Sequence, residues 1–123
     1  KIAEITNKYA NAISSINTLQ VEVVDKKGEQ ALPGPNRLRS GVCGAPIKWA
    51  GLEMVKKLNR VRKVKKYKFE IVGVGGVMTP EDYFEYRKLG ADLVQSATGA
   101  MWNPYLAHEI WLASLRSGKK ERA

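Results

Sequence analysis

The sequence has few of the residues on which several common kinds of protein depend. Its single cysteine, Cys43, excludes an internal disulfide framework and is typical of a reducing compartment. Its single histidine, His108, has no cysteine or carboxylate at metal-ligand spacing, so we predict a surface position and no metal site. No apolar run approaches the roughly 18 residues that a membrane span needs. We therefore expect a cytoplasmic protein without a membrane partner.

Acidic residues are scarce relative to basic ones: 21 basic and 12 acidic residues give a formal net charge of +9. This charge favours anionic ligands without naming one. Many of the basic residues fall on the outer face and end of a helix predicted over residues 49–63. Proteins that bind single-stranded nucleic acid interleave such basic residues with aromatic side chains that stack on the bases. No aromatic residues interleave with these, so we do not expect a nucleic-acid partner. The basic residues on the outer face and end of this helix are Lys56, Lys57, Arg60, Arg62, Lys63, Lys65 and Lys66. Its predicted inner, apolar stripe is Leu52, Val55, Leu58 and Val61.

The rest of the chain is organised around a β–α–β unit over residues 69–100. An apolar strand is predicted over 69–74 and a second strand over 91–95. Between them lies a helix with Thr79 as its N-cap, proline at the first helical position and acids in the first turn, and Gly90 ends it. Strands joined in this way are parallel neighbours in one sheet.

Each strand of this unit runs into a turn of small residues. Gly75-Gly76 follows the first strand and Ser96 to Gly99 follows the second. Glycine lets the backbone approach a phosphate closely, and backbone N–H groups beside a helix N-terminus favour an anion. In (β/α)8 barrels a phosphate site commonly forms from the loops after the last two strands. The two turns therefore predict a phosphate site.

Before and after this unit the pattern continues in the same order. A helix end is predicted over 1–9 and a strand over 12–16. The last helix is predicted to begin at Pro104, with Asn103 as its cap, and to end at Gly118. Its apolar face is Leu106, Ile110, Trp111, Ser114 and Leu115, and the three tryptophans of the chain, Trp49, Trp102 and Trp111, are expected to be core or interface anchors.

Residues 19–39 interrupt the pattern between a strand and its helix. Val21 to Val24 and Gln30 to Leu32 flank a turn over 25–28, which predicts a small hairpin, and Pro33 to Asn36 then breaks regular structure. A long insertion between a strand and its helix more often has a function than not. We expect a lid over a site.

The fold class that follows is α/β, the C-terminal half of a TIM (β/α)8 barrel, with three parallel strands, helices outside and a small inserted hairpin. We expect a single domain over 1–123, with 19–39 as an insertion. A full barrel needs roughly 200 residues or more, so this chain supplies about half of one. Such a half leaves both sheet edges unpaired, and we expect it to need the missing half-barrel or a homo-oligomer partner.

The order and spacing of four motifs along nearly the whole chain resemble the C-terminal half of the dihydroorotate dehydrogenase family. The flavin-binding, pyrimidine-reducing domain of dihydropyrimidine dehydrogenase is similar to the same residues. The four motifs are Asn17-Thr18, Ser40 to Lys48 (SGVCGAPIK), Ile71 to Val77 (IVGVGGV) and Gly90 to Thr98 (GADLVQSAT).

The resemblance implies an FMN-dependent oxidoreductase that oxidises dihydroorotate to orotate in pyrimidine biosynthesis. By this resemblance Asn17 would bind the pyrimidine substrate and Thr18 would lie beside it and the flavin. Cys43 and Gly44 would lie against the ribityl chain or ring. The catalytic base and a flavin-contacting lysine belong to the other half of the family's barrel, so no catalytic residue is expected here and the chain alone should be inactive. The groups expected to bind the FMN phosphate are Gly75, Gly76, Ala97 and Thr98.

Plainer interpretations stay open beside these. The chain would reduce a pyrimidine if it resembles dihydropyrimidine dehydrogenase more closely, or it would be a non-catalytic phosphate-binding or scaffold module. Gly75-Gly76 would then be a tight turn and Asn17-Thr18 a satisfied strand end. Cys43 is expected to be a small packing residue rather than a reactive thiol.

Overall fold

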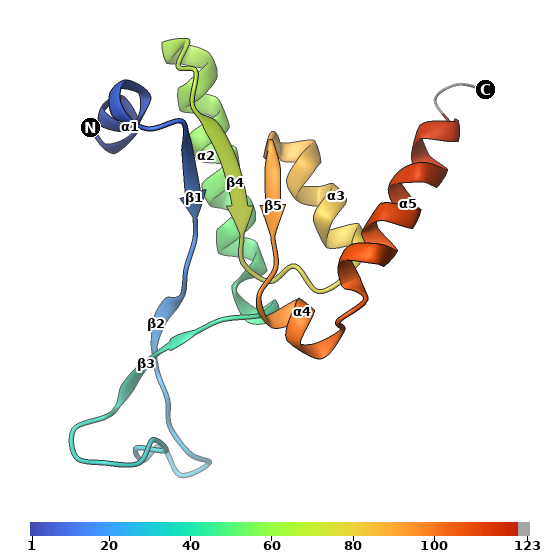
Figure 1. Cartoon of the computed structure of the whole chain (residues 1–123). Helices are drawn as coiled ribbons and strands as arrows, with labels where there is room; N and C mark the ends of the chain where they lie inside the picture. The colour runs from blue at the N-terminus through green and yellow to red at the C-terminus, as the bar shows by residue number, and fades with distance from the viewer. Residues whose placement is uncertain (121–123) are drawn as a thin grey trace.

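A three-stranded parallel sheet carries the fold of the computed structural model, which describes residues 1–120 (Figure 1). The strands are β1 (Ala12–Ser15), β4 (Glu70–Val74) and β5 (Leu93–Gln95), in the order β1-β4-β5. Ser14 of β1 lies opposite Val72 of β4, which in turn lies opposite Leu93 of β5. The three predicted strands and their parallel pairing are confirmed. The last three residues of the predicted domain lie outside the described residues.

The helices connect these strands in the predicted order. They are α1 (Ile2–Tyr9), α2 (Lys48–Lys65), α3 (Pro80–Leu89), α4 (Thr98–Trp102) and α5 (Leu106–Lys120), with a short 3₁₀ helix, η1 (Ala45–Ile47), before α2. α2 leads from the β1 side into β4, and α3 leads from β4 into β5 (Figure 1). Parallel strands joined in sequence by helices on one face form a segment of a (β/α)8 barrel. The predicted fold class is confirmed.

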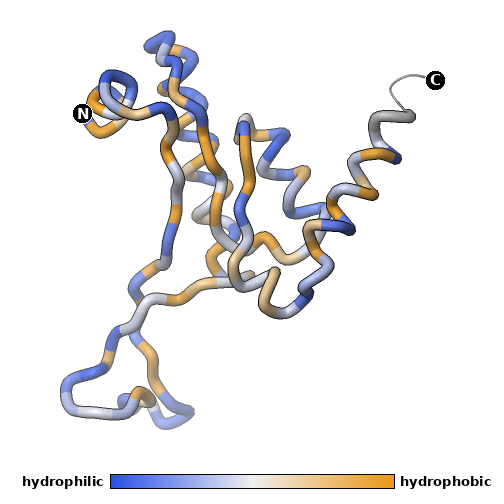
Figure 2. The backbone as a smooth tube through the Cα atoms, in the orientation of Figure 1, coloured by the Kyte–Doolittle hydropathy of each residue, from blue (hydrophilic) through white to orange (hydrophobic). Residues whose placement is uncertain are grey.

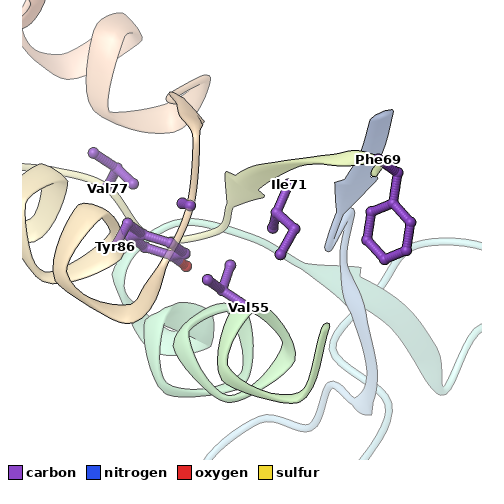
Figure 3. Close-up of a cluster of buried hydrophobic side chains, with 6 residues drawn as sticks. Val55, Phe69, Ile71, Val77 and Tyr86 are labelled. Atoms are coloured by element: carbon purple, nitrogen blue, oxygen red, sulfur yellow. The ribbon is translucent and has the colours of Figure 1, made fainter. Parts of the chain in front are cut away.

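The core lies between the sheet and the helices α2 and α3 (Figure 3). Val55 of α2, Ile71 of β4 and Tyr86 of α3 are fully buried there, with Phe69 and Val77 at the two ends of β4. Successive strand residues face opposite sides, so Ile71 points to the helices while Glu70 points away from them. The core is small and lies mainly on one face of the sheet, although Val72 of β4, which points to the other face, is also buried.

Local signals in the sequence place the ends of α3 correctly. The Thr79 hydroxyl accepts a hydrogen bond from the backbone N–H of Asp82, and the Asp82 carboxylate accepts one from the N–H of Thr79. This reciprocal capping box satisfies N–H groups that the first turn of a helix leaves unpaired. Gly90 ends the helix in the left-handed conformation at φ 104°, as predicted.

The predicted inner stripe of α2 is wrong at its last position. Val61 is exposed, whereas Arg62, assigned to the basic outer face, turns inward. Its guanidinium donates to the carbonyl oxygens of Phe69 (3.3 Å) and Gly90 (3.0 Å) and pairs with the Asp92 carboxylate. Position 62 lies two helical turns beyond Val55 and therefore on the same face of α2. The carboxylate of Asp92, just before β5, meets Arg62 there.

The last helix also differs from its prediction. It begins at Leu106 rather than Pro104 and runs through Gly118 to Lys120, because one glycine costs a helix only about 1 kcal/mol. Asn103, the predicted cap, lies three residues before this start, and its side chain accepts from the backbone N–H of Tyr105 (3.0 Å), outside the helix. Leu106, Ile110 and Ser114 share the buried stripe, while Trp111 and Leu115 lie one position further around and are exposed.

None of the three tryptophans lies in the core, contrary to one of the two roles expected of them. The exposed fractions of Trp49, Trp102 and Trp111 are 63%, 80% and 55%. His108 is exposed, as predicted, and its ring lies 5.6 Å from that of Trp111. The tryptophans therefore remain candidates for contacts with another chain.

Residues 19–42 form an arm that projects from the carboxyl end of β1 (Figure 1). Its ladder pairs β2 (Leu19–Glu22) with β3 (Arg39–Val42), a strand that the sequence analysis did not predict. The predicted hairpin survives only as one bridge, Val24 to Gln30. In the ladder, alternate residues of both strands share a face, so apolar Leu19, Val21 and Val42 lie on one side, and the Glu22–Arg39 ion pair lies on the other.

The opposite face of the parallel sheet is open. Ala12 and Ser14 of β1, Glu70 of β4, and Leu93 and Gln95 of β5 are exposed on it, and β1 and β5 each pair on one side only. Figure 2 shows apolar stretches on all three strands, with polar positions on β1 and at the end of β5. In a closed barrel this face would line the interior. Across the described residues, no helix is long and apolar enough to cross a membrane.

Candidate functional site

A cavity of about 290 Å³ lies where the three parallel strands end. Because the carboxyl ends of parallel strands meet at one edge, the segments after β1, β4 and β5 converge there, together with the turn before α2 and the start of α4 (Figure 1). All eight residues predicted for the site line this cavity. They are Asn17, Thr18, Cys43, Gly44, Gly75, Gly76, Ala97 and Thr98. Their proposed binding roles stay predictions.

The turn after β4 is held from behind by side chains that the sequence analysis did not single out. The Tyr86 hydroxyl donates to the carbonyl oxygen of Gly75 (2.6 Å) and lies 3.3 Å from that of Val74. The Ser96 hydroxyl donates to the carbonyl oxygen of Val77 (2.7 Å). These hydroxyls come from α3 and from the end of β5, so only the folded structure shows their role.

Gly76 is required by packing as well as by any ligand. Its φ is 68°, and a Cβ at this position would lie 2.7 Å from Cβ and 2.8 Å from Cα and N of Lys48. The turn therefore lies directly against the first residue of α2. In the part of the chain that the structure describes, the backbone N–H group of Gly76 donates to no protein acceptor.

The second predicted turn becomes the start of α4. Ala97 is its N-cap and makes no capping hydrogen bond through its side chain, so N–H groups of the first turn are left without a cap. Gly99 is buried and packs so closely on the turn after β4 that a Cβ there would collide with the carbonyl oxygen of Val77. This close contact brings α4 against the turn after β4 and forms one wall of the cavity.

Cys43 and Gly44 face α4 across the cavity. The Thr98 hydroxyl lies 3.4 Å from the Cys43 sulfur, and a Cβ on Gly44 would lie 3.1 Å from the Thr98 methyl group. Gly44 has φ 76°, a conformation that favours glycine. Cys43 is exposed, so the prediction that it is a packing residue is wrong. The loop before α2 turns its side chain toward the cavity instead.

Asn17 and Thr18 lie after β1 at the base of the arm, and both are exposed. Thr18 packs closely on the arm, because a Cβ on Gly41 would lie 2.6 Å from its hydroxyl oxygen. The arm itself, residues 19–42, contributes nothing to the cavity lining. The predicted lid is therefore not over the cavity, because the β2–β3 ladder carries the arm away from the sheet (Figure 1).

The cavity lining contains no carboxylate, imidazole, amine or guanidinium. Its polar groups are amides, hydroxyls, one thiol and backbone N–H groups, which can bind and orient a ligand. Proton transfer to or from a bound substrate would therefore need a group from outside this set, or the thiol. Residues that line the cavity without having been predicted include Ile47, Gln95, Ser96 and Met101.

Charged groups gather behind the turn instead. The Lys48 ammonium pairs with Asp82 (2.7 Å) and Glu85 (3.0 Å), and its hydrogen bond to Asp82 is the main cause that raises the pKa of Lys48. Burial works to raise the pKa of Asp82, but the hydrogen bonds from Lys48 and from the N–H groups of Met78 and Thr79 outweigh it and lower that pKa. Burial raises the pKa of Tyr86 to about 12, so its hydroxyl stays a donor near neutral pH.

A family model described as dihydroorotate dehydrogenase matches residues 1–114. This fold and site define a segment of an α/β barrel with a ligand cavity at the carboxyl ends of its strands. The chain belongs to the dihydroorotate dehydrogenase family.

Named relatives agree with this assignment. The chain is 46% identical over 97 residues to a dihydroorotate dehydrogenase of Dictyostelium discoideum, which covers 78% of this chain and 26% of the relative. It is 36% identical over 110 residues to the catalytic subunit of a dihydroorotate dehydrogenase B (NAD(+)) of Trichlorobacter lovleyi, with 85% and 34% covered. The chain thus spans about a quarter to a third of the relatives' length.

A solved structure shows the same fold. The dihydroorotate dehydrogenase of Eimeria tenella, determined in complex with ferulenol, matches with a TM-score of 0.66 over 89% of this chain and 27% of its own. At 18% sequence identity this match speaks for the fold alone. It agrees with the barrel segment deduced from the strand order.

Proposed function

We propose that this chain is the FMN-binding part of an enzyme that oxidises dihydroorotate to orotate in pyrimidine biosynthesis. The observation that carries the proposal is one cavity, lined by all eight predicted residues, in a member of the dihydroorotate dehydrogenase family. The relatives' names favour dihydroorotate oxidation over the reduction of another pyrimidine. Activity would require the remainder of a barrel, since relatives are about three to four times as long as the matched segment.

The residues present fit the phosphate end of FMN. Gly76 presents an N–H group that has no protein acceptor among the described residues, and the first turn of α4, at Thr98, lies opposite without a side-chain cap. Such convergent N–H groups bind phosphate without needing a lysine or arginine. The cavity volume is at the lower end of the range for small-molecule sites, which suits one end of a nucleotide.

The substrate would bind on the β1 side of the same cavity. Asn17 carries both a donor and an acceptor and is exposed at the strand end, so it can pair with the polar edge of a pyrimidine. Thr18 would stand between this substrate and the flavin. Bound FMN would supply the hydride acceptor. Because the lining holds no carboxylate or imidazole, the base that takes the substrate proton would come from the completing half.

The open sheet supports the need for completion. β1 and β5 each have an unpaired edge, and the face that would line a barrel is exposed. We propose residues 1–123 as one partial domain with residues 19–39 as an insertion, completed by a half-barrel or by another copy of the chain. If the completed barrel binds no flavin, the chain is instead a phosphate-binding or scaffold module without catalytic activity.

The proposal is tested in a chimera in which this chain replaces the matching segment of the Dictyostelium relative. We expect the purified chimera to carry bound FMN, identified by mass after release. Ala97→Glu adds a negative charge at an exposed residue of the cavity and should abolish FMN retention by repelling the phosphate. Ala100→Glu, also exposed and on the same helix but outside this cavity, is the matched control and should keep its FMN. Equal FMN content in the two variants would show that the phosphate does not bind at this position.

A further inference from the structure

We infer that Tyr86 is a positioning residue for the phosphate-binding turn, and that its hydroxyl sets how tightly the turn holds the phosphate of FMN. The inference rests on the proposed function, because it concerns the same cavity. Tyr86 lies in α3 and does not line the cavity itself. It would act through the backbone of Val74 to Gly76.

The hydroxyl contacts two successive carbonyl oxygens of the turn. It donates to Gly75 at 2.6 Å and lies 3.3 Å from the oxygen of Val74, which also accepts from the N–H of Ile16. In a planar trans peptide the C=O and the N–H of the same unit point in opposite directions. Drawing these two oxygens toward Tyr86 therefore turns the N–H groups of Gly75 and Gly76 away from it, and both glycines line the cavity.

The chain makes room for this side chain at two glycines. A Cβ on Gly51 of α2 would collide with the Tyr86 hydroxyl, and one on Gly73 of β4 would collide with its ring. Tyr86 is fully buried as a result (Figure 3). A phenylalanine would fill the core equally well, so the hydroxyl needs a separate reason.

Two neighbouring contacts act in the same direction. The Ser96 hydroxyl holds the carbonyl oxygen of Val77, and the Asp82 carboxylate holds the N–H groups of Met78 and Thr79. Together with Tyr86 they fasten each end of the turn, Tyr86 and Asp82 from outside the cavity lining and Ser96 from within it. Among the described residues, the N–H groups of Gly76 and Val77 then have no protein acceptor, so the turn presents donors, and no carbonyl oxygen held by these hydroxyls, to a bound anion.

The test compares FMN with riboflavin, which lacks the phosphate, by fluorescence titration of the flavin-free chimera described above. Wild type should bind FMN on the order of 100-fold more tightly than riboflavin, because hydrogen bonds to a charged phosphate are strong. Tyr86→Phe should narrow this preference by about tenfold while leaving riboflavin binding nearly unchanged. Tyr83→Phe removes a hydroxyl from the same helix without touching the turn and should leave the preference intact.

A purely structural role for Tyr86 would weaken both ligands alike and leave their ratio unchanged, and this result would overturn the inference. If wild type shows no preference for FMN, the proposed phosphate site itself fails. Circular dichroism monitors folding. Should Tyr86→Phe not fold, Ser96→Ala removes the hydroxyl that holds Val77, and an unchanged ratio in that folded variant would likewise overturn the inference.

Discussion

At the scale of single residues, Gly76 shows that a site glycine can be fixed by packing. A substitution there cannot test ligand binding alone, because a Cβ would lie 2.7–2.8 Å from atoms of Lys48. We predict that Gly76→Ala lowers the free energy of unfolding by about 2–4 kcal/mol, from backbone strain at positive φ and this contact. Gly28→Ala has φ 83° but meets nothing within 4 Å, so it should cost about 1 kcal/mol. Urea denaturation measures both, and equal losses would contradict the packing argument.

Asn17 carries the prediction about substrate. In the chimera, Asn17→Ala should lower kcat/KM for dihydroorotate by about 30- to 1000-fold, or roughly 2–4 kcal/mol, because the pyrimidine loses its polar partner. FMN should remain bound, since its phosphate lies across the cavity. Asn11→Ala, at the other end of β1, should change neither quantity. Loss of FMN with normal turnover per bound flavin would make Asn17 a cofactor or folding residue.

The residues that line the cavity could be predicted because each stands next to a strand end or within a glycine turn, and these signals are local. Tyr86 and Lys48 could not, because Tyr86 contacts a backbone carbonyl 11 residues away and Lys48 a carboxylate 34 residues away. Nothing in the spacing of the chain shows that a phenol from α3 reaches a carbonyl after β4. The exposed state of Cys43 was missed for the same reason, since the direction of a side chain depends on its folded neighbours.

At the scale of elements, the capping box of α3 makes a prediction about pH. Asp82 has a lowered pKa, so its carboxylate stabilises the fold fully above the ordinary value of 3.8 and loses that contribution as the pH falls below it. Asp82→Asn should therefore lower the free energy of unfolding by about 1–3 kcal/mol near neutral pH. The difference from wild type should shrink below about pH 3.8. Denaturation midpoints across this range measure it.

Glu81→Gln is the control for this experiment, since it removes one negative charge from the same exposed first turn. It should have little effect on unfolding at any pH in the series. A difference between wild type and Asp82→Asn that stays constant through the acid range would show that the pKa of Asp82 is not lowered in the folded state.

Elements with strong local signals were predicted within one or two residues, as β4 and α3 show. The failures lie where a distant partner decides. Arg62 turns inward because Asp92 and two carbonyl oxygens meet it, although its neighbours in sequence are basic and exposed. β3 forms because Arg39–Val42 pairs with Leu19–Glu22 across the arm. Its own sequence, which contains glycine and serine, does not predict a strand.

At the scale of the whole molecule, the chain leaves much apolar surface uncovered. Ile2 and Ile5 on α1, Leu93 on the open sheet face, and Met101 and Trp102 on α4 are 56–83% exposed. Two strand edges are unpaired as well. We predict that the isolated chain self-associates at micromolar concentration. Sedimentation velocity measures this, and a compact, stable monomer would contradict the barrel-segment account.

The central claim is that this chain supplies the FMN and pyrimidine sites of a dihydroorotate dehydrogenase and lacks the base. Orotate formation by the chimera tests it most directly, followed by ultraviolet absorbance with the isolated chain assayed in parallel. The account predicts that the FMN-loaded chimera converts dihydroorotate to orotate at a rate comparable to that of its Dictyostelium parent, and that the isolated chain forms none. A folded, FMN-loaded chimera that forms no orotate, or an isolated chain that does, would contradict it.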